Sequence, residues 1–276
     1  MEKFSNILGE HEFAGDNLNE NLLFFKNEKF FEDFYNRNLD ITRQDMKNSV
    51  NWDVLLIQSV NSAEEINKTA NLLSKRLREW YELYNPEISR RIGDHEKFIE
   101  EVTVKEKNDI LKDLGIGINE SLGASLKESD LEPIKNLGIA IKDLYKLKKK
   151  QMVYLSSLME GACPNIKIVC GALIGAKLIE HAGSLKKLSG MPASKIQILG
   201  AEKSLFRHMK TGSKPPRHGV IAEHPLIANA PEKLHGKIAR TLADKICIAA
   251  KVDYFHGNFI GENLKKGLEV KFGKTF

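Results

Sequence analysis

Apolar side chains recur at alternating steps of three and four residues through the first half of the chain. This spacing is typical of a helix that packs along one face, and over several turns it forms the seam of a coiled coil. Because proline interrupts helical hydrogen bonding, we predict a long helix that ends or kinks at Asn85-Pro86. Its seam residues are Ala63, Ile66, Ala70, Leu73, Leu77, Trp80 and Tyr84.

A second long helix is expected to return along the first. Glycines at positions 115, 117 and 123 predict the turn between the two, and a further helix is expected over residues 94–102. Ser129 and Glu132, with Pro133 directly after them, form the pattern of a capping box at a helix start. The apolar line of the returning helix is Ile134, Leu137, Ile141, Leu144, Met152, Leu155 and Met159. Two such helices predict an antiparallel coiled-coil hairpin of about 40 Å.

The segments on either side of this hairpin have different patterns. Near the N-terminus, aromatic residues at helical spacing predict a short amphipathic helix that packs through its aromatic face; they are Phe24, Phe25, Phe30, Phe31, Phe34 and Tyr35. After the hairpin, shorter helices separated by glycine and proline are expected around a compact core that begins at Ile166, and long β-branched alternation is missing. We predict an all-α protein with a short helical segment at 1–45, a coiled-coil dimerisation arm at 46–160 and a compact helical domain at 161–276.

Charge divides the chain into two unlike halves. Residues 151–276 hold 19 lysines and arginines against 9 acidic residues, a balance of +10, whereas residues 1–150 balance at −5. A basic surface of this strength attracts phosphates, so RNA or DNA becomes the leading class of partner. The longest apolar-or-glycine run has nine residues, too few for a membrane span, and the N-terminus does not resemble a secretory signal. We therefore expect a cytoplasmic protein without a membrane partner.

The basic residues of the second half gather in one stretch. Lys203, Arg207 and Lys210 recur at steps of four and three on one helix face, while Leu205, Phe206 and Met209 are expected to face the core. A proline-stiffened loop follows, and a later helix supplies a second wall of the expected basic cleft. The candidate RNA-binding residues are Lys203, Arg207, His208, Lys210, Lys214, Arg217, His218, Lys237 and Arg240.

An enzymatic interpretation of the same stretch would use its histidines and carboxylates. His208, His218 and His224 with Glu202 or Glu223 could in principle form a metal or acid–base cluster, but no metal-ligand spacing is present. The three cysteines, Cys163, Cys170 and Cys247, lack a C-x-x-C pattern and are expected to be core thiols. We therefore expect no catalytic residue, no metal and no cofactor. A third hypothesis makes the coiled coil itself the function.

Several motifs in this order resemble the Nop-domain family, which includes the archaeal box C/D guide-ribonucleoprotein scaffold and its nucleolar and spliceosomal relatives. The resemblance extends over residues 40–272 and includes a junction motif at residues 160–165. Its motifs in the basic half are Gly200-Ala201-Glu202-Lys203, Leu205-Phe206-Arg207-His208, Pro216-Arg217-His218-Gly219, Gly236-Lys237-Ile238-Ala239-Arg240 and Ala249-Ala250-Lys251-Val252-Asp253-Tyr254-Phe255.

The resemblance implies a non-catalytic scaffold in a complex for guide-directed RNA 2′-O-methylation. In that family the compact domain binds a box C/D-type guide RNA at its kink-turn together with a ribosomal-protein-like subunit, and the coiled coil dimerises. Lys203, Arg207 and His208 would then approach the RNA backbone and the end of the guide duplex, and Arg217 the RNA stem. The expected assembly of this chain is a homodimer through the arm.

The chain departs from the family pattern at both ends. Family members usually have an N-terminal α/β domain of roughly a hundred residues that docks the methyltransferase fibrillarin, and a lysine-rich C-terminal tail. Only about 40 residues precede the resemblance here, so docking of fibrillarin stays open. The alternative is a reduced paralogue, a coiled-coil dimerisation or RNP-binding module that does not recruit the methyltransferase.

Overall fold

The computed structural model describes residues 28–273, and within this range the chain is all-α, as predicted, with no strand. The chain forms two units, residues 1–51 and 52–276. In the described part, no helix is long and apolar enough to cross a bilayer. The description below takes each unit by itself.

The first unit contains one described helix, α3 (Glu28–Asn48), at the predicted place but longer than expected. Phe24 and Phe25 lie outside the described residues, as does the side chain of Phe30. Phe31 and Tyr35 stack on each other with ring centroids 6.2 Å apart, yet both are exposed. The prediction that these two aromatics pack is therefore wrong, because no other described element of this unit covers them.

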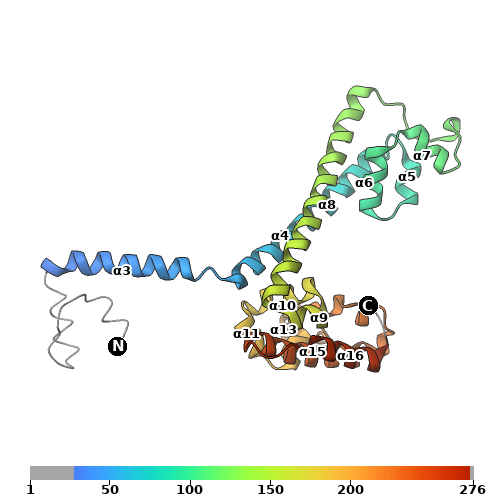
Figure 1. Cartoon of the computed structure of the whole chain (residues 1–276). Helices are drawn as coiled ribbons and strands as arrows, with labels where there is room; N and C mark the ends of the chain where they lie inside the picture. The colour runs from blue at the N-terminus through green and yellow to red at the C-terminus, as the bar shows by residue number, and fades with distance from the viewer. Residues whose placement is uncertain (1–27, 274–276) are drawn as a thin grey trace, which may run out of the picture. The chain divides into compact units, whose positions relative to one another are not determined.

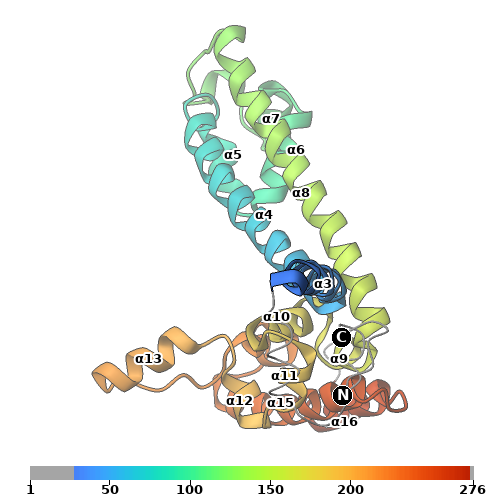
Figure 2. The ribbon, with the colours of Figure 1, turned by 90° about the vertical axis from the view of Figure 1, so that its left-hand side faces the viewer.

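The second unit contains the predicted hairpin. Its two long helices, α4 (Trp52–Tyr81) and α8 (Glu128–Ala162), lie side by side in Figures 1 and 2. One predicted seam line is confirmed, because Ala63, Ala70 and Leu77 are buried. The other is wrong in part: Ile66 and Leu73 are only half-buried and Trp80 is exposed. The second buried line of α4 is instead Val60, Ser74 and Tyr81.

Polar side chains explain this shift of the seam. Ser74 Oγ lies 3.3 Å from the Tyr145 hydroxyl of α8, and that hydroxyl donates to Asn71 Oδ1 at 3.1 Å. Lys148 Nζ of α8 donates to Asn67 Oδ1 at 2.8 Å. Because buried polar groups are stable only when hydrogen-bonded, these pairs fix the register of the two helices where an apolar pattern cannot show it.

The start of α8 also differs from the prediction. Ser129 is the second residue of the helix and not its cap, since the flanking position is Lys127. Acidic Glu128 and Asp130 occupy the first turn, where the positive end of the helix dipole favours them. Pro133 lies inside the helix, near enough to its start that few backbone bonds are lost. The capping-box prediction is therefore wrong, although the helix itself is confirmed.

Three short helices and one 3₁₀ turn connect the two long helices. They are α5 (Pro86–Arg91), α6 (His95–Val104), α7 (Lys107–Asp113) and η1 (Ile118–Glu120). The expected helix over residues 94–102 is α6, whose first turn is capped by Asp94 at 2.8 Å from Lys97 N. Arg78 of α4 holds α6 in place: its guanidinium lies 4.2 Å from the Phe98 ring centroid and donates to His95 Nδ1. The sequence pattern missed α7.

The compact body follows α8. Its helices are α9 (Pro164–Cys170), α10 (Ala172–Ala182), α11 (Leu185–Ser189), α12 (Ala193–Ile198), α14 (Pro225–Ala228), α15 (Glu232–Tyr254) and α16 (Gly261–Phe272). The predicted core is confirmed at Ile166, Val169, Leu178 and Ile179, which are fully buried. This core continues into the base of the arm, because it includes Leu56 and Val60 of α4 and Leu155 and Met159 of α8. The arm and the body therefore share one core.

A buried carboxylate fastens the junction between arm and body. Asp253 of α15 accepts hydrogen bonds from Asn165 N at 3.1 Å, Asn165 Nδ2 at 2.7 Å and Ile166 N at 2.9 Å. Asn165 Oδ1 in turn accepts from Ile260 N, just before α16. Burial raises the pKa of Asp253, although these hydrogen bonds oppose the shift. The start of α9 is thus tied to both C-terminal helices.

Acid should weaken this fold through His224, which is fully buried before α14. Burial, aided by the charge of Lys265, lowers its pKa to about 4, against the effect of a backbone hydrogen bond at Val169. The unfolded chain, with an ordinary histidine pKa of about 6.5, binds the proton more readily. Stability should therefore fall as the pH drops from about 6.5 towards 4, by at most about 1.4 kcal/mol per pH unit.

Urea unfolding between pH 7 and pH 4.5 measures this loss. His224→Gln should show a shallower decline of the unfolding midpoint than the wild type, whatever its stability at pH 7. His256→Asn, at an exposed position, should keep the wild-type slope. Equal slopes for the wild type and His224→Gln would contradict the assignment.

Candidate RNA–protein interface

Helix α13 (Glu202–Thr211) projects from the compact body (Figure 2) and has no buried residue. Leu205 is half-buried, whereas Phe206 is 60% and Met209 72% exposed. The prediction that Phe206 and Met209 face the core is therefore wrong. The physical reason lies at Gly200, whose φ of +87° turns the chain away from the body just before the helix begins. We call residues 200–219 the basic lobe.

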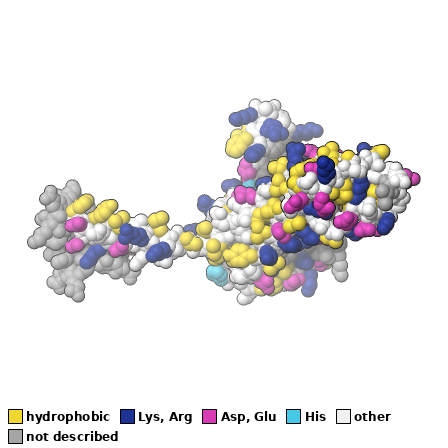
Figure 3. Space-filling model, turned by 90° about the horizontal axis from the view of Figure 1, so that it is seen from above, with side chains coloured by type: hydrophobic (Ala, Val, Ile, Leu, Met, Phe, Trp, Pro, Cys, Tyr) yellow, Lys and Arg dark blue, Asp and Glu magenta, His cyan; other side chains and the backbone are white. Residues whose placement is uncertain are grey.

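Cations cover the outer side of the basic lobe. Lys203, Arg207 and Lys210 are exposed on α13, and Lys214 follows in the loop. None of these four forms an ion pair with another residue of the described chain. Seen from above, Lys and Arg side chains gather on this projecting lobe beside a hydrophobic patch (Figure 3). Like charges held together without ion-pair partners attract anions, and most strongly an anion with several charges.

The turn at the end of α13 is held by its own side chains. His208 Nδ1 is hydrogen-bonded to the carbonyl oxygen of Ser213. Gly212 has a φ of +66°, in the left-handed region that ends many helices, and its N–H donates to His208 O. His208 is half-buried at this turn, and its hydrogen bond to Ser213 occupies one of its two ring nitrogens.

At the root of the basic lobe, the chain that enters the lobe and the chain that leaves it are hydrogen-bonded to each other, although neither forms a strand. Gly219 N donates to Gln197 O at 2.9 Å and Val220 N to Leu199 O at 2.8 Å, while Gln197 Nε2 donates to Arg217 O at 2.8 Å. A Cβ atom at Gly219 would lie 1.9 Å from Leu199 O, so only glycine fits. This role of Gly219 was not predicted from the sequence. The one sequence feature that points to a tight backbone contact here is a glycine directly after Pro-Arg-His.

The proline-stiffened loop after α13 contacts the first turns of α15. Arg217 Nη1 lies 3.6 Å from Glu232 Oε1, and both side chains are largely exposed. The rings of His218 and His235 are 6.0 Å apart, and His235 Nε2 is hydrogen-bonded to Ala230 O at 2.8 Å. The structure therefore brings Arg217 and His218 together beside α15, at the base of the basic lobe.

Lys237 and Arg240 lie farther along α15. Lys237 borders a hollow of about 360 Å³ that it shares with Leu234, Lys271 and Phe272, and no residue of the basic lobe lines this hollow. Arg240 is exposed one turn later. Among the described residues, no hydrogen bond or ion pair joins the side chain of Lys237 or Arg240 to the basic lobe, so the single cleft with two walls expected from the sequence stays a prediction.

The residues of the enzymatic interpretation do not come together. His224 is buried, where its Nδ1 accepts from Leu226 N at 3.2 Å, and Glu223 pairs with Lys177. Across residues 28–273, no group of three or more His, Cys, Asp and Glu side chains could hold a metal ion. Cys163 and Cys170 are buried free thiols, and burial raises the pKa of each above the ordinary range.

Comparisons with known proteins agree with this architecture. A model of the Nop family, described as "snoRNA binding domain, fibrillarin", matches residues 62–274. An uncharacterised NOP5 family protein of Methanocaldococcus jannaschii is 38% identical over 279 aligned positions, covering 94% of this chain and 67% of the relative. Nucleolar protein 56 of Schizosaccharomyces pombe is 36% identical over 234 positions, covering 78% of this chain and 47% of that protein.

A solved structure is also similar over nearly the whole chain. One chain of a fibrillarin/Nop5p complex superimposes with a TM-score of 0.52 at 25% identity, covering 98% of this chain and 89% of its own. This chain spans less than half of the nucleolar protein that it matches. The family match extends over most of the arm and the entire described body. The chain therefore belongs to the Nop family.

Proposed function

We propose that this chain is a non-catalytic scaffold that binds a box C/D-type guide RNA at its kink-turn, together with the ribosomal-protein-like subunit already on that RNA. The observation that carries the proposal is the projecting basic lobe, where cations without ion-pair partners lie beside exposed Phe206 and Met209. Cations alone fit a phosphate backbone. The added apolar side chains fit a target that also offers bases or a protein surface.

The nine candidate residues take different places in this proposal. Lys203, Arg207, Lys210 and Lys214 supply charge for the RNA backbone from the outer side of the basic lobe. Arg217 and His218 lie at its base, close enough to α15 to bind a stem that rests there. His208 supports the turn, and Lys237 with Arg240 extends the basic surface along α15. The complex would serve guide-directed 2′-O-methylation of RNA.

A methyltransferase is the next partner to assay. The similar solved chain comes from a complex with fibrillarin, and the family description also names fibrillarin. A pull-down with fibrillarin therefore separates the full scaffold from a module that binds RNP without recruiting the enzyme.

Replacing Arg207 by alanine should weaken binding to a preformed complex of kink-turn RNA and its subunit about tenfold, because a charge-assisted phosphate contact is lost. The slope of log K against log salt should become less steep by about one, since one fewer counterion is released. A gel-shift titration across a salt series measures both quantities. Arg217→Ala should behave similarly, with thermal stability unchanged in both variants.

Arg43→Ala is the matched control. Arg43 is an exposed arginine on α3, paired with Asp40 at 3.0 Å, and its loss should change neither affinity nor salt slope. Equal binding by the wild type, Arg207→Ala and Arg217→Ala would rule out the basic lobe as the RNA-binding surface.

We also propose that two copies of the chain associate through the arm. Helix α6 covers one side of the hairpin, where Arg78 of α4 contacts His95 and Lys149 of α8 pairs with Glu96. Helical geometry places Leu72 and Trp80 away from Arg78, and Leu147 away from Lys149. These three side chains are exposed large apolar residues, an unusual set for a free surface, and we call them the apolar stripe of the arm.

A charged residue in the apolar stripe of the arm should prevent two copies of the chain from associating. Leu72→Asp and Leu147→Asp should shift the sedimentation coefficient from that of a dimer to that of a monomer at micromolar concentration, because each buries an unpaired carboxylate at the interface. Val104→Asp, at an exposed valine of α6, is the control and should leave the dimer intact. A monomeric wild type, or dimers in all variants, would refute the proposed interface.

A further inference from the structure

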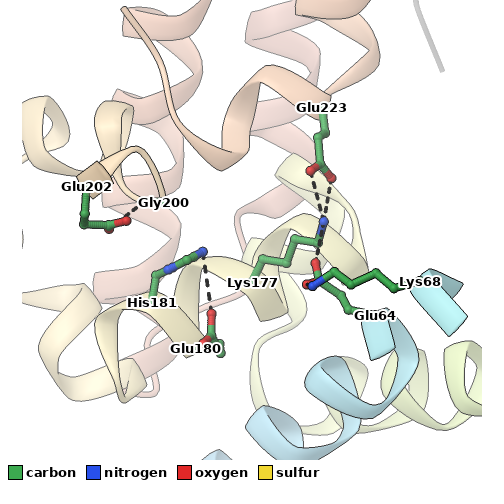
Figure 4. A network of polar contacts seen from close by, with 8 residues as sticks. All are labelled: Glu64, Lys68, Lys177, Glu180, His181, Gly200, Glu202 and Glu223. Carbon is green, nitrogen blue, oxygen red and sulfur yellow. Dashed lines mark hydrogen bonds and ion pairs between the residues drawn. The ribbon is translucent and has the colours of Figure 1, made fainter. Parts of the chain in front are cut away.

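Lys177 of α10 lies where the arm, the body and the chain after the basic lobe meet (Figure 4). Its Nζ is 2.8 Å from Glu64 Oε1 of α4 and donates to both carboxylate oxygens of Glu223, at 2.8 Å and 3.0 Å. Glu223 ends the 3₁₀ helix η2 (Val220–Glu223). One ammonium group therefore joins two carboxylates from segments about 160 residues apart in the sequence.

The charges of this contact are well formed. The Lys177 side chain is only 14% exposed. Burial alone would lower the pKa of Lys177, but the hydrogen bonds and charges of Glu223 and Glu64 more than offset burial, and the pKa is raised. The hydrogen bond from Lys177 is also the main reason that the pKa of Glu64 is lowered. Without the ammonium group, two carboxylates would face each other, with Lys68, 3.5 Å from Glu64, and Lys148, which lines the same hollow, as the cations nearby.

A few hydrogen-bonded residues connect Glu223 to the basic lobe. The helix η2 begins directly after Gly219, and Gly219 and Val220 donate to the carbonyls of Gln197 and Leu199. On the other side of the root, Gly200 N donates to Glu202 Oε1 at 2.8 Å, which fixes the first turn of α13. A displacement of η2 would therefore move both ends of the basic lobe, because Gly219 directly precedes η2 and Val220 of η2 is hydrogen-bonded to Leu199, which directly precedes Gly200.

We infer that Lys177 is a positioning residue that sets the orientation of the basic lobe relative to the arm. This inference rests on the proposed function, since orientation matters only if the basic lobe binds a target of fixed shape. An RNA with a bound protein subunit is such a target, because its phosphates and its protein surface must be met together. In a dimer, the same contact would also set the spacing between two basic lobes.

The direct test measures the distance between arm and lobe in the whole chain, free of RNA. Spin labels are attached at Val104→Cys, on α6 of the arm, and Met209→Cys in a Cys247→Ser background, and labelled chains are diluted with unlabelled ones. Cys163 and Cys170 are buried and need no change. Wild type should give a narrow distance distribution and Lys177→Gln a broad or shifted one. Lys177→Arg, which keeps the charge and two donors, should restore the narrow distribution.

Two further variants decide between a local and a general effect. Lys68→Gln removes the other lysine that contacts Glu64 but leaves the Lys177 bridge intact, so its distribution should match the wild type. Glu223→Gln removes the negative charge and one of the two acceptor oxygens from only the half of the bridge that leads to the basic lobe, and it should broaden the distribution even if Lys177→Gln fails to fold. Unchanged distributions in Lys177→Gln and Glu223→Gln would overturn the inference.

RNA binding supplies the second readout. Lys177→Gln should bind the complex of kink-turn RNA and subunit about fivefold more weakly, with the salt slope of the wild type, because no phosphate contact is removed. A lowered slope would mean that Lys177 contacts RNA itself and would overturn the positioning role. If the wild type binds no RNA complex, the proposed function fails, while the spin-label distances still test the bridge.

Discussion

The apolar core at the base of the arm is the constraint on which the other features depend. Leu56 and Val60 of α4 and Leu155 and Met159 of α8 are buried in the same core as α9, α10 and α15. Because both arm helices enter this core, the arm cannot turn without opening the body. Burial of these four side chains of the arm is worth on the order of 1.5–3 kcal/mol for each. The hydrogen-bonded Asp253 then fastens the start of α9 at the same place.

This shared core gives the basic lobe a fixed support. Helix α13 has no fully buried residue, so its position depends mainly on the glycines and hydrogen bonds of its root and on the adjoining η2. A helix that carries cations without partners is unfavourable in isolation, since like charges repel. Such an arrangement is stable at the end of a rigid support, and it leaves the charge available for a phosphate backbone. Rigid support and free charge together fit the proposed scaffold role.

Much of this architecture is predictable from the sequence because it depends on apolar periodicity. The steps of three and four residues locate α4 and α8, and the glycine- and proline-rich change after residue 160 locates the body. Where polar side chains decide, the prediction fails. The buried line through Ser74 is invisible to an apolar pattern, and α8 begins at Glu128, one residue before Ser129, with acidic residues in its first turn and no capping box.

The candidate site shows a similar limit of prediction from the sequence. The spacing of Lys203, Arg207 and Lys210 identifies the basic face correctly as exposed, but the sequence assigns Phe206 and Met209 to a core. The positive φ of Gly200 turns the chain away from the body. The φ of a glycine cannot be read from the sequence, so this turn could not be predicted. The Lys177 bridge joins residues far apart along the chain, so no local pattern could have predicted it.

The most direct test of the central claim is a gel shift of the whole chain on three targets. These are a box C/D kink-turn RNA alone, the ribosomal-protein-like subunit alone, and the two assembled, each across a salt series. The account predicts a salt-sensitive shift of the assembled complex at concentrations that leave either component alone unbound. Equal binding to the bare RNA and to the assembled complex, or no shift at any salt, would contradict it.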